Sequence, residues 1–242
     1  MKKTALPILV PILCLLLPVL AGCFSRPDGT ASDAEPEQAH VPYTETVRSR
    51  DVTDRDGRLL VKCTLVYPEF ESDALNGIVS AFVRSFSDAA AASASEVQAY
   101  DPGPYEFSYA CRVKACNEKM VSLSIEEYIY QGGAHGRTDF YGLVLDPETG
   151  AAISPAALLG MEGGEAKEAV RQAFRELIAS DVEHKCFFPN ANELLDGILE
   201  TGMPTYYADG GEVIFILQTY EIAGNAAGPQ SVSLPLGGAY AE

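Results

Sequence analysis

The chain has 242 residues, and its 34 Asp and Glu against 17 Lys and Arg give a formal net charge of −17. Hydrophobic residues make up 47% and charged residues 21%, a globular composition that excludes a disordered chain. The acidic balance argues against nucleic acid and against docking on anionic lipid, because both need clustered Lys and Arg. The length predicts one large domain or two small ones packed together.

Residues 1–22 have the pattern of a bacterial lipoprotein signal peptide. Two lysines follow Met1, and the apolar run from Leu6 to Ala21 is shorter than the roughly 20 residues of a membrane-spanning helix. The run ends in Leu-Ala-Gly-Cys, the lipobox, so we predict cleavage before Cys23 and acylation of its thiol. The alternative is an ordinary secretory signal with an incidental cysteine.

An acylated Cys23 would anchor the mature chain to a lipid bilayer, since two or three acyl chains bind stably. We therefore expect the protein on the outer face of the cytoplasmic membrane, or on the periplasmic face of an envelope membrane. Loss of two lysines and no acid with the signal peptide changes the net charge from −17 to −19. Residues 23–42, rich in Pro, Asp, Glu, Ser and Ala, are predicted to form a flexible tether behind the lipidated cysteine.

The pattern changes at residue 43. Residues 47–52 and 59–67 are predicted strands, separated by an Asp-Arg-Asp-Gly turn. A helix is predicted over 72–97, because apolar residues from Leu75 to Phe86 recur at helical spacing and Ser72 can cap the first turn.

Strands and helices are then expected to alternate to the end of the chain. Helical periodicity predicts a second helix over 164–184 and a short one over 190–199. The predicted strands are residues 105–116, 120–130, 138–145, 205–208, 212–220 and 230–236. Helices between antiparallel hairpins indicate an α+β fold with antiparallel sheets, two main helices and two closely packed sub-regions, 43–130 and 131–242.

Four cysteines remain available for disulfides in an extracytoplasmic chain, and they allow three pairings. Cys111 and Cys116 are five residues apart, so a strand places them on opposite faces and they are poorly placed to pair. Strand parity gives a weak preference for Cys63 with Cys111 and Cys116 with Cys186. Buried or unpaired thiols are the alternative.

Catalytic motifs are absent from the sequence. It contains no G-x-S-x-G, H-E-x-x-H, P-loop or C-x-x-C pattern, and only three scattered histidines. Glu126 and Glu127 are adjacent on a predicted strand, so they face opposite sides and cannot flank one substrate. We expect no catalytic residues, no metal and no cofactor.

The segment Gln131-Gly-Gly-Ala-His-Gly136, between two predicted strands, is the most distinctive local cluster. Its three glycines allow a sharp bend and close approach of another chain. His135 could satisfy a backbone carbonyl in a structural turn, contact a ligand or partner, or act in catalysis.

With this cluster the chain resembles an extracytoplasmic bacterial domain of largely unknown function. That domain occurs in RsiV-type, lysozyme-sensing anti-sigma factors and as an accessory part of PdaC-type peptidoglycan deacetylases. The resemblance covers roughly residues 43–238 and is carried by the segments 128–136, 145–150, 206–207, 213–216, 220–223 and 227–229, with 66–70 and the following helix resembling the companion segment. The candidate partner-binding residues from its two most specific blocks are Gly132, Gly133, His135, Gly136, Tyr220 and Glu221.

The resemblance implies a binding-type module without the deacetylase or sigma-binding parts. We expect a non-catalytic, lipid-anchored protein that binds a cell-envelope component such as peptidoglycan, or an incoming protein such as lysozyme. Lysozyme is basic, and a charge of −19 would steer it at low ionic strength. The alternatives are an enzyme on cell-wall glycan that uses His135, and a scaffold in envelope assembly.

Overall fold

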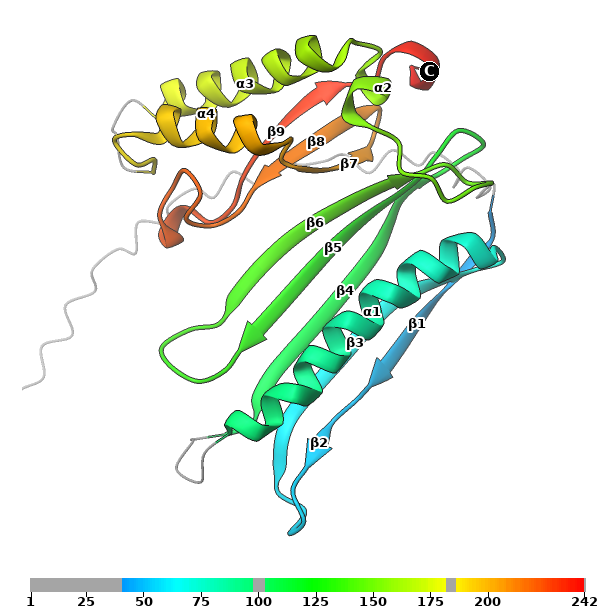
Figure 1. Cartoon of the computed structure of the whole chain (residues 1–242), viewed down its shortest axis with the longest axis vertical. Coiled ribbons are helices and arrows are strands. Elements are labelled where there is room, and N and C mark those ends of the chain that lie inside the picture. The colour runs from blue at the N-terminus through cyan, green and yellow to red at the C-terminus, as the bar shows by residue number, and fades with distance from the viewer. Residues whose placement is uncertain (1–40, 98–102, 182–185, 242) are drawn as a thin grey trace, which may run out of the picture. The chain divides into compact units, whose positions relative to one another are not determined.

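The computed structural model describes residues 41–97, 103–181 and 186–241. The predicted signal peptide, Cys23 and nearly all of the predicted tether lie outside these residues. The described chain is α+β, as predicted, with two sheets and the helices that cover them (Figure 1). Within the same residues, no helix combines the length and the apolar character needed to cross a membrane.

The first sheet has six strands in the order β1-β3-β4-β5-β6, with β2 paired to β3. Its strands are β1 (Tyr43–Ser49), β2 (Val52–Thr53), β3 (Leu59–Phe70), β4 (Tyr105–Cys116), β5 (Val121–Tyr130) and β6 (Arg137–Leu145). The strand after the glycine cluster, β6, pairs along its whole length with β5. The first sheet therefore continues past residue 130, and the second sheet begins only after Leu145.

Helix α1 (Asp73–Ser93) connects β3 to β4 and lies along one face of the first sheet (Figure 1). The Ser72 side chain accepts a hydrogen bond from the Leu75 amide at 3.4 Å, which is the predicted N-cap. Because α1 is a crossover, β3 and β4 run parallel. The expectation of purely antiparallel sheets is wrong for this one pair.

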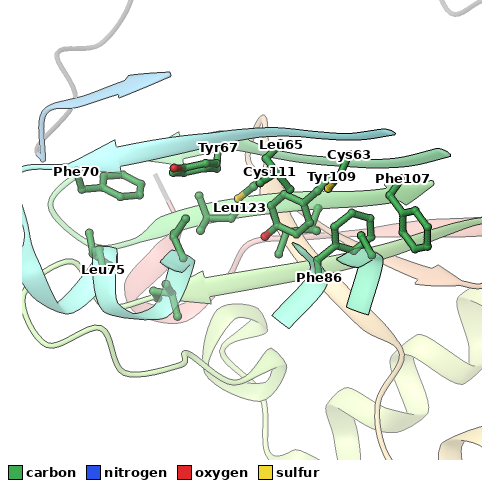
Figure 2. Close-up of a cluster of buried hydrophobic side chains, with 14 of the residues drawn as sticks. Cys63, Leu65, Tyr67, Phe70, Leu75, Phe86, Phe107, Tyr109, Cys111 and Leu123 are labelled. Carbon is green, nitrogen blue, oxygen red and sulfur yellow. The ribbon is translucent and has the colours of Figure 1, made fainter. Parts of the chain in front are cut away.

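The core of the first sheet forms between this helix and the inward side chains of β3, β4 and β5 (Figure 2). Phe86 of α1 packs against the rings of Phe107 and Tyr109 on β4, with centroids 5.9 and 5.5 Å apart. The Tyr109 hydroxyl is buried without a conventional hydrogen-bond partner, and the thiol of Cys111 is the polar group that interacts with it. Burial raises the pKa of Tyr109.

Cys63 and Cys111 both lie in this core (Figure 2), where burial raises their pKa values to about 11 and about 12. Cys63 is registered with Phe107, four residues before Cys111. At about 3.3 Å per residue, that offset is about 13 Å along the strands, whereas a disulfide needs Cα atoms within about 7 Å. The preferred Cys63–Cys111 pairing therefore does not fit the sheet. Both cysteines face the same core, but the register of β3 against β4 keeps them too far apart along the strands.

The other two cysteines have different surroundings. Cys116 is half-buried, with its thiol donating toward the Val41 carbonyl at 3.4 Å, and Cys186 is exposed. Their pairing stays a prediction.

The second sheet, β7-β8-β9, is antiparallel and its helices lie along one of its faces (Figure 1). It consists of β7 (Thr205–Asp209), β8 (Glu212–Leu217) and β9 (Gln230–Pro235), with α2 (Pro155–Leu159), α3 (Gly163–Ser180) and α4 (Ala191–Thr201). The inward residues of β8, among them Phe215, pack with Phe174 of α3 and Leu195 of α4 in a separate core. The predicted strand 212–220 ends at Leu217 because Gln218 turns away from β9 and Tyr220 adopts a positive φ of 71°.

The two sheets meet where β7 crosses β6 and β5. The Ala208 amide donates to the buried hydroxyl of Ser122, and the Gly142 amide donates to the hydroxyl of Thr205, at 2.8 and 2.7 Å. Gly142 is required here, because a Cβ would lie 2.0 Å from the carbonyl oxygen of Tyr206. This junction fixes the outer face of the second sheet against the face of the first sheet that α1 leaves uncovered.

Candidate functional site

The glycine cluster forms the exposed hairpin loop between β5 and β6. Gly132 and Gly133 have φ values of 90° and 93°, a region in which glycine is favoured, and the Tyr130 hydroxyl donates to the Gly133 carbonyl at 3.1 Å. His135 is exposed, and its Nδ1 lies 3.1 Å from the Gly136 carbonyl oxygen. The loop thus presents its imidazole to solvent rather than to a buried acid.

Gly136 has a packing role at the base of this loop. A Cβ at this position would lie 2.4 Å from the ring of Tyr128 on β5, so a larger residue would require that ring to turn aside. Tyr128 faces away from α1, since it is registered with Ser108 and Thr138 on the neighbouring strands. Gly136 therefore helps to set the aromatic surface of the uncovered face.

The second candidate block, Tyr220 and Glu221, lies beside the junction between the sheets. The Glu221 carboxylate accepts a hydrogen bond from the Gln218 amide at 2.5 Å. The Gln218 side chain in turn accepts from the Phe140 amide and donates to the Phe140 carbonyl, so it pairs with β6 as a neighbouring strand would. Burial raises the pKa of Glu221, partly offset by the Gln218 hydrogen bond, while Tyr220 is 60% exposed.

A groove of about 290 Å³ lies between the uncovered face of the first sheet and the outer face of the second. Its walls are the rings of Phe140 and Tyr207 and the side chain of Ile216, three apolar surfaces from both sheets. The polar side chains that line it are those of Arg112, Lys114, Ser124, Glu126 and Ser231. Ring walls with a few convergent polar groups are typical of small-ligand sites.

The two cations of the groove have different surroundings. The Lys114 ammonium lies 3.2 Å from the Asp209 carboxylate and 5.5 Å from the centroid of the Tyr207 ring. Arg112, two residues earlier on β4, is exposed and takes part in no ion pair within residues 41–97, 103–181 and 186–241. Lys114 therefore stabilises the wall, whereas the Arg112 guanidinium is available to a ligand.

A second hollow of about 200 Å³ adjoins the groove on the same face of the sheet. It is lined by Tyr43 and Glu45 of β1, Pro68 of β3 and, again, Arg112. Because Arg112 lines both hollows, its side chain connects them across the uncovered face.

The neighbouring glutamates of β5 point to opposite faces, as predicted. Glu126 lines the groove and is registered with Ala110 and Phe140. Glu127 lies on the other face, where burial and the neighbouring Asp139 raise its pKa. The two carboxyl groups therefore cannot act on one bound molecule.

No cluster of three or more His, Cys, Asp or Glu side chains that could hold a metal ion is present in the described part of the chain. The groove offers a guanidinium, one carboxylate and hydroxyls between aromatic walls. Such groups can bind and orient a ligand, and they contain no nucleophile paired with a base.

Neither Arg112 nor Lys114 stands out in the sequence, because no motif surrounds them. The available signal was the strict alternation from Glu106 to Lys114, which places every polar side chain on one face of the strand. Only the packing of β7 across this face turns those side chains into a groove.

Comparison with known proteins supports the family resemblance. Residues 57–138 match the family model described as deacetylase PdaC. A crystal structure of a DUF3298 family protein from Pseudomonas aeruginosa PAO1 is 14% identical with a TM-score of 0.53, covering 81% of this chain and 90% of that one. A DUF3298 family member from Bacteroides fragilis is 15% identical with a TM-score of 0.51, covering 83% of this chain and 95% of that one.

No curated protein matches the chain. Residues 57–138 are therefore similar to a PdaC-type domain, and the chain shares the fold of DUF3298 family proteins.

Proposed function

We propose that this protein is a non-catalytic, lipid-anchored, extracytoplasmic module that binds a glycan component of the cell envelope. The observation that carries the proposal is the groove of about 290 Å³ between the two sheets. Its Phe140 and Tyr207 rings offer flat apolar surfaces of the kind that sugar rings pack against, and its hydroxyls and charged groups can hydrogen-bond to sugar substituents.

The anchoring part of the proposal rests on the lipobox at Cys23. In cells, the protein should incorporate radiolabelled palmitate, and Cys23→Ser should abolish that incorporation. Labelling that persists in Cys23→Ser would contradict a lipid anchor at this residue.

A pulldown on purified peptidoglycan sacculi tests the glycan part, using residues 24–242, which lack the predicted signal peptide and the lipidated cysteine. Tyr207→Ala removes one wall of the groove and should weaken retention. Phe82→Ala is the matched control, because Phe82 is a 39% exposed aromatic of α1, on the opposite side of the sheet from the groove. If the protein with an unaltered groove is not retained on sacculi, the proposal is overturned.

The non-catalytic part is tested separately on the same substrate. Neither the unaltered protein nor His135→Ala should modify sacculi, as measured by released sugars and deacetylated amines. Product formation that depends on His135 would instead establish the rival interpretation, a glycan-modifying enzyme.

Lysozyme is a second candidate partner, favoured by the net charge of −17, which becomes −19 without the two lysines of the signal peptide, and by the resemblance to lysozyme-sensing anti-sigma factors. Association should be fast at low salt and slow at high salt, since the Debye length falls to about 3 Å at 1 M. Surface-exchange binding at both salt concentrations measures this effect. No binding at low salt would remove lysozyme as a partner.

A further inference from the structure

We propose that Arg112 is the anion-binding residue of the groove, and that the ligand it holds is a monocarboxylate that also carries amide N–H groups, such as an amino sugar with a lactyl or peptide acid. The inference rests on the proposed glycan-binding function and adds the chemical class of the ligand. It follows from how the charges of the groove are partnered.

Arg112 lies on β4, an inner strand of the first sheet. It is registered with Ser124 of β5, which holds its backbone, and it lies two residues past the last β4 residue that pairs with β3. A guanidinium presents a planar fork of donors that matches both oxygens of a carboxylate. The exposed Arg112 therefore offers a bidentate site on a rigid support.

Lys114 is already engaged and is not the main anion contact. The Asp209 carboxylate already neutralises Lys114, and the Tyr207 ring covers part of its ammonium. An anion that approached Lys114 would meet the negative charge of Asp209 as well. Among the described residues that line the groove, Arg112 is consequently the cation that remains for an anion.

The unpaired charges of the groove balance one another. Glu126 lies on the same face as Arg112, one row along β5, and lines the same groove. With Lys114 paired, one guanidinium and one carboxylate remain, within a protein of net charge −17. Such a site repels a phosphodiester polyanion and favours a ligand with a single acid, whose N–H groups can donate to Glu126.

Calorimetry on residues 24–242, the chain without its predicted signal peptide and lipidated cysteine, compares two soluble probes of similar size. N-acetylmuramyl dipeptide carries amides and a carboxylate, whereas tri-N-acetylglucosamine carries amides and no acid. We expect the muramyl dipeptide to bind more tightly, and Arg112→Ala to weaken it by about 10- to 100-fold, the loss of a charge-assisted hydrogen-bond pair. Arg112→Lys should give an intermediate affinity.

Arg55→Ala is the matched control, because Arg55 is an exposed arginine in the turn between β2 and β3 and does not line the groove. It should bind the muramyl dipeptide like the unaltered protein. Equal binding of the two probes, or an unchanged affinity in Arg112→Ala, would overturn the inference while retention on sacculi still supports the proposed function. Failure of both probes and of sacculi to bind would overturn both.

Discussion

Substitution of Gly142 by alanine should separate the two sheets. A Cβ at Gly142 would lie 2.0 Å from the carbonyl oxygen and 2.3 Å from the carbonyl carbon of Tyr206, and 2.9 Å from the amide nitrogen of Tyr207. These are backbone atoms, so no side-chain rotation can relieve the contact. The strands β6 and β7 must move apart.

The expected loss of stability follows from two contributions. Overpacking in a well-packed interface costs about 1–3 kcal/mol. The displaced strand also loses the 2.7 Å hydrogen bond from Gly142 to the Thr205 hydroxyl, which contributes about 0.5–1.5 kcal/mol. The free energy of unfolding should fall by about 2–4 kcal/mol, which corresponds to a Tm lower by roughly 5–15 °C for a domain of this size.

Thermal unfolding followed by circular dichroism measures this effect. Gly77→Ala is the matched control, because Gly77 lies within α1 and a Cβ added there would have no neighbouring atom within 4 Å. That variant should be as stable as the original protein or more stable, by up to about 1 kcal/mol. A Gly142→Ala protein that melts within about 1 °C of the original would refute the close approach of the sheets on which the groove depends.

The junction, the buried carboxyl and the thiols each give a further prediction. Gln218→Ala should lower the free energy of unfolding by about 1–3 kcal/mol and speed hydrogen exchange at the Phe140 amide, since both hydrogen bonds to the Phe140 backbone are lost. Gln172→Ala is the control and should have neither effect, because the Gln172 side chain donates to the exposed Glu176 carboxylate of the same helix. Glu127 has a raised pKa in the folded state, so its contribution to stability falls as pH rises through that pKa. Glu127→Gln should therefore stabilise the protein near pH 7 and change its stability little below about pH 4. A variant with the same urea midpoint as the original protein at both pH values would contradict this. Alkylation at pH 8 followed by peptide mass spectrometry should modify the exposed Cys186, whereas the two buried thiols of the first core should react only after denaturation, and rapid native labelling of either would show that the core is open.

Local patterns predicted most of the secondary structure. The strand over 105–116 has the observed bounds, and Ser72 caps α1, because alternation and capping depend on neighbours in the chain. The five-residue helix α2 is too short to show a period, so it is missed. The strand over 212–220 is predicted three residues too long, because beyond Leu217 the Gln218 side chain bonds to the backbone of Phe140, which is distant in the sequence.

The pairing of distant strands required the tertiary structure. The parallel β3–β4 pair arises because α1 carries the chain back over the sheet, and no local pattern shows that return. The same register separates Cys63 from Cys111, although strand parity alone places both on the buried face. Parity is a property of one strand, whereas a disulfide depends on the offset between two.

The sequence by itself determined the acidic charge, the α+β class, the lipobox pattern and the family resemblance, because each depends on composition or on residues close together in the chain. It also singled out His135 and Glu221, which the structure places in an exposed loop and at the sheet junction. The groove at Arg112 was decided only by the tertiary structure. Its walls come from strands about 100 residues apart, and the packing of β7 across β6 brings them together at a glycine that leaves no room for a side chain.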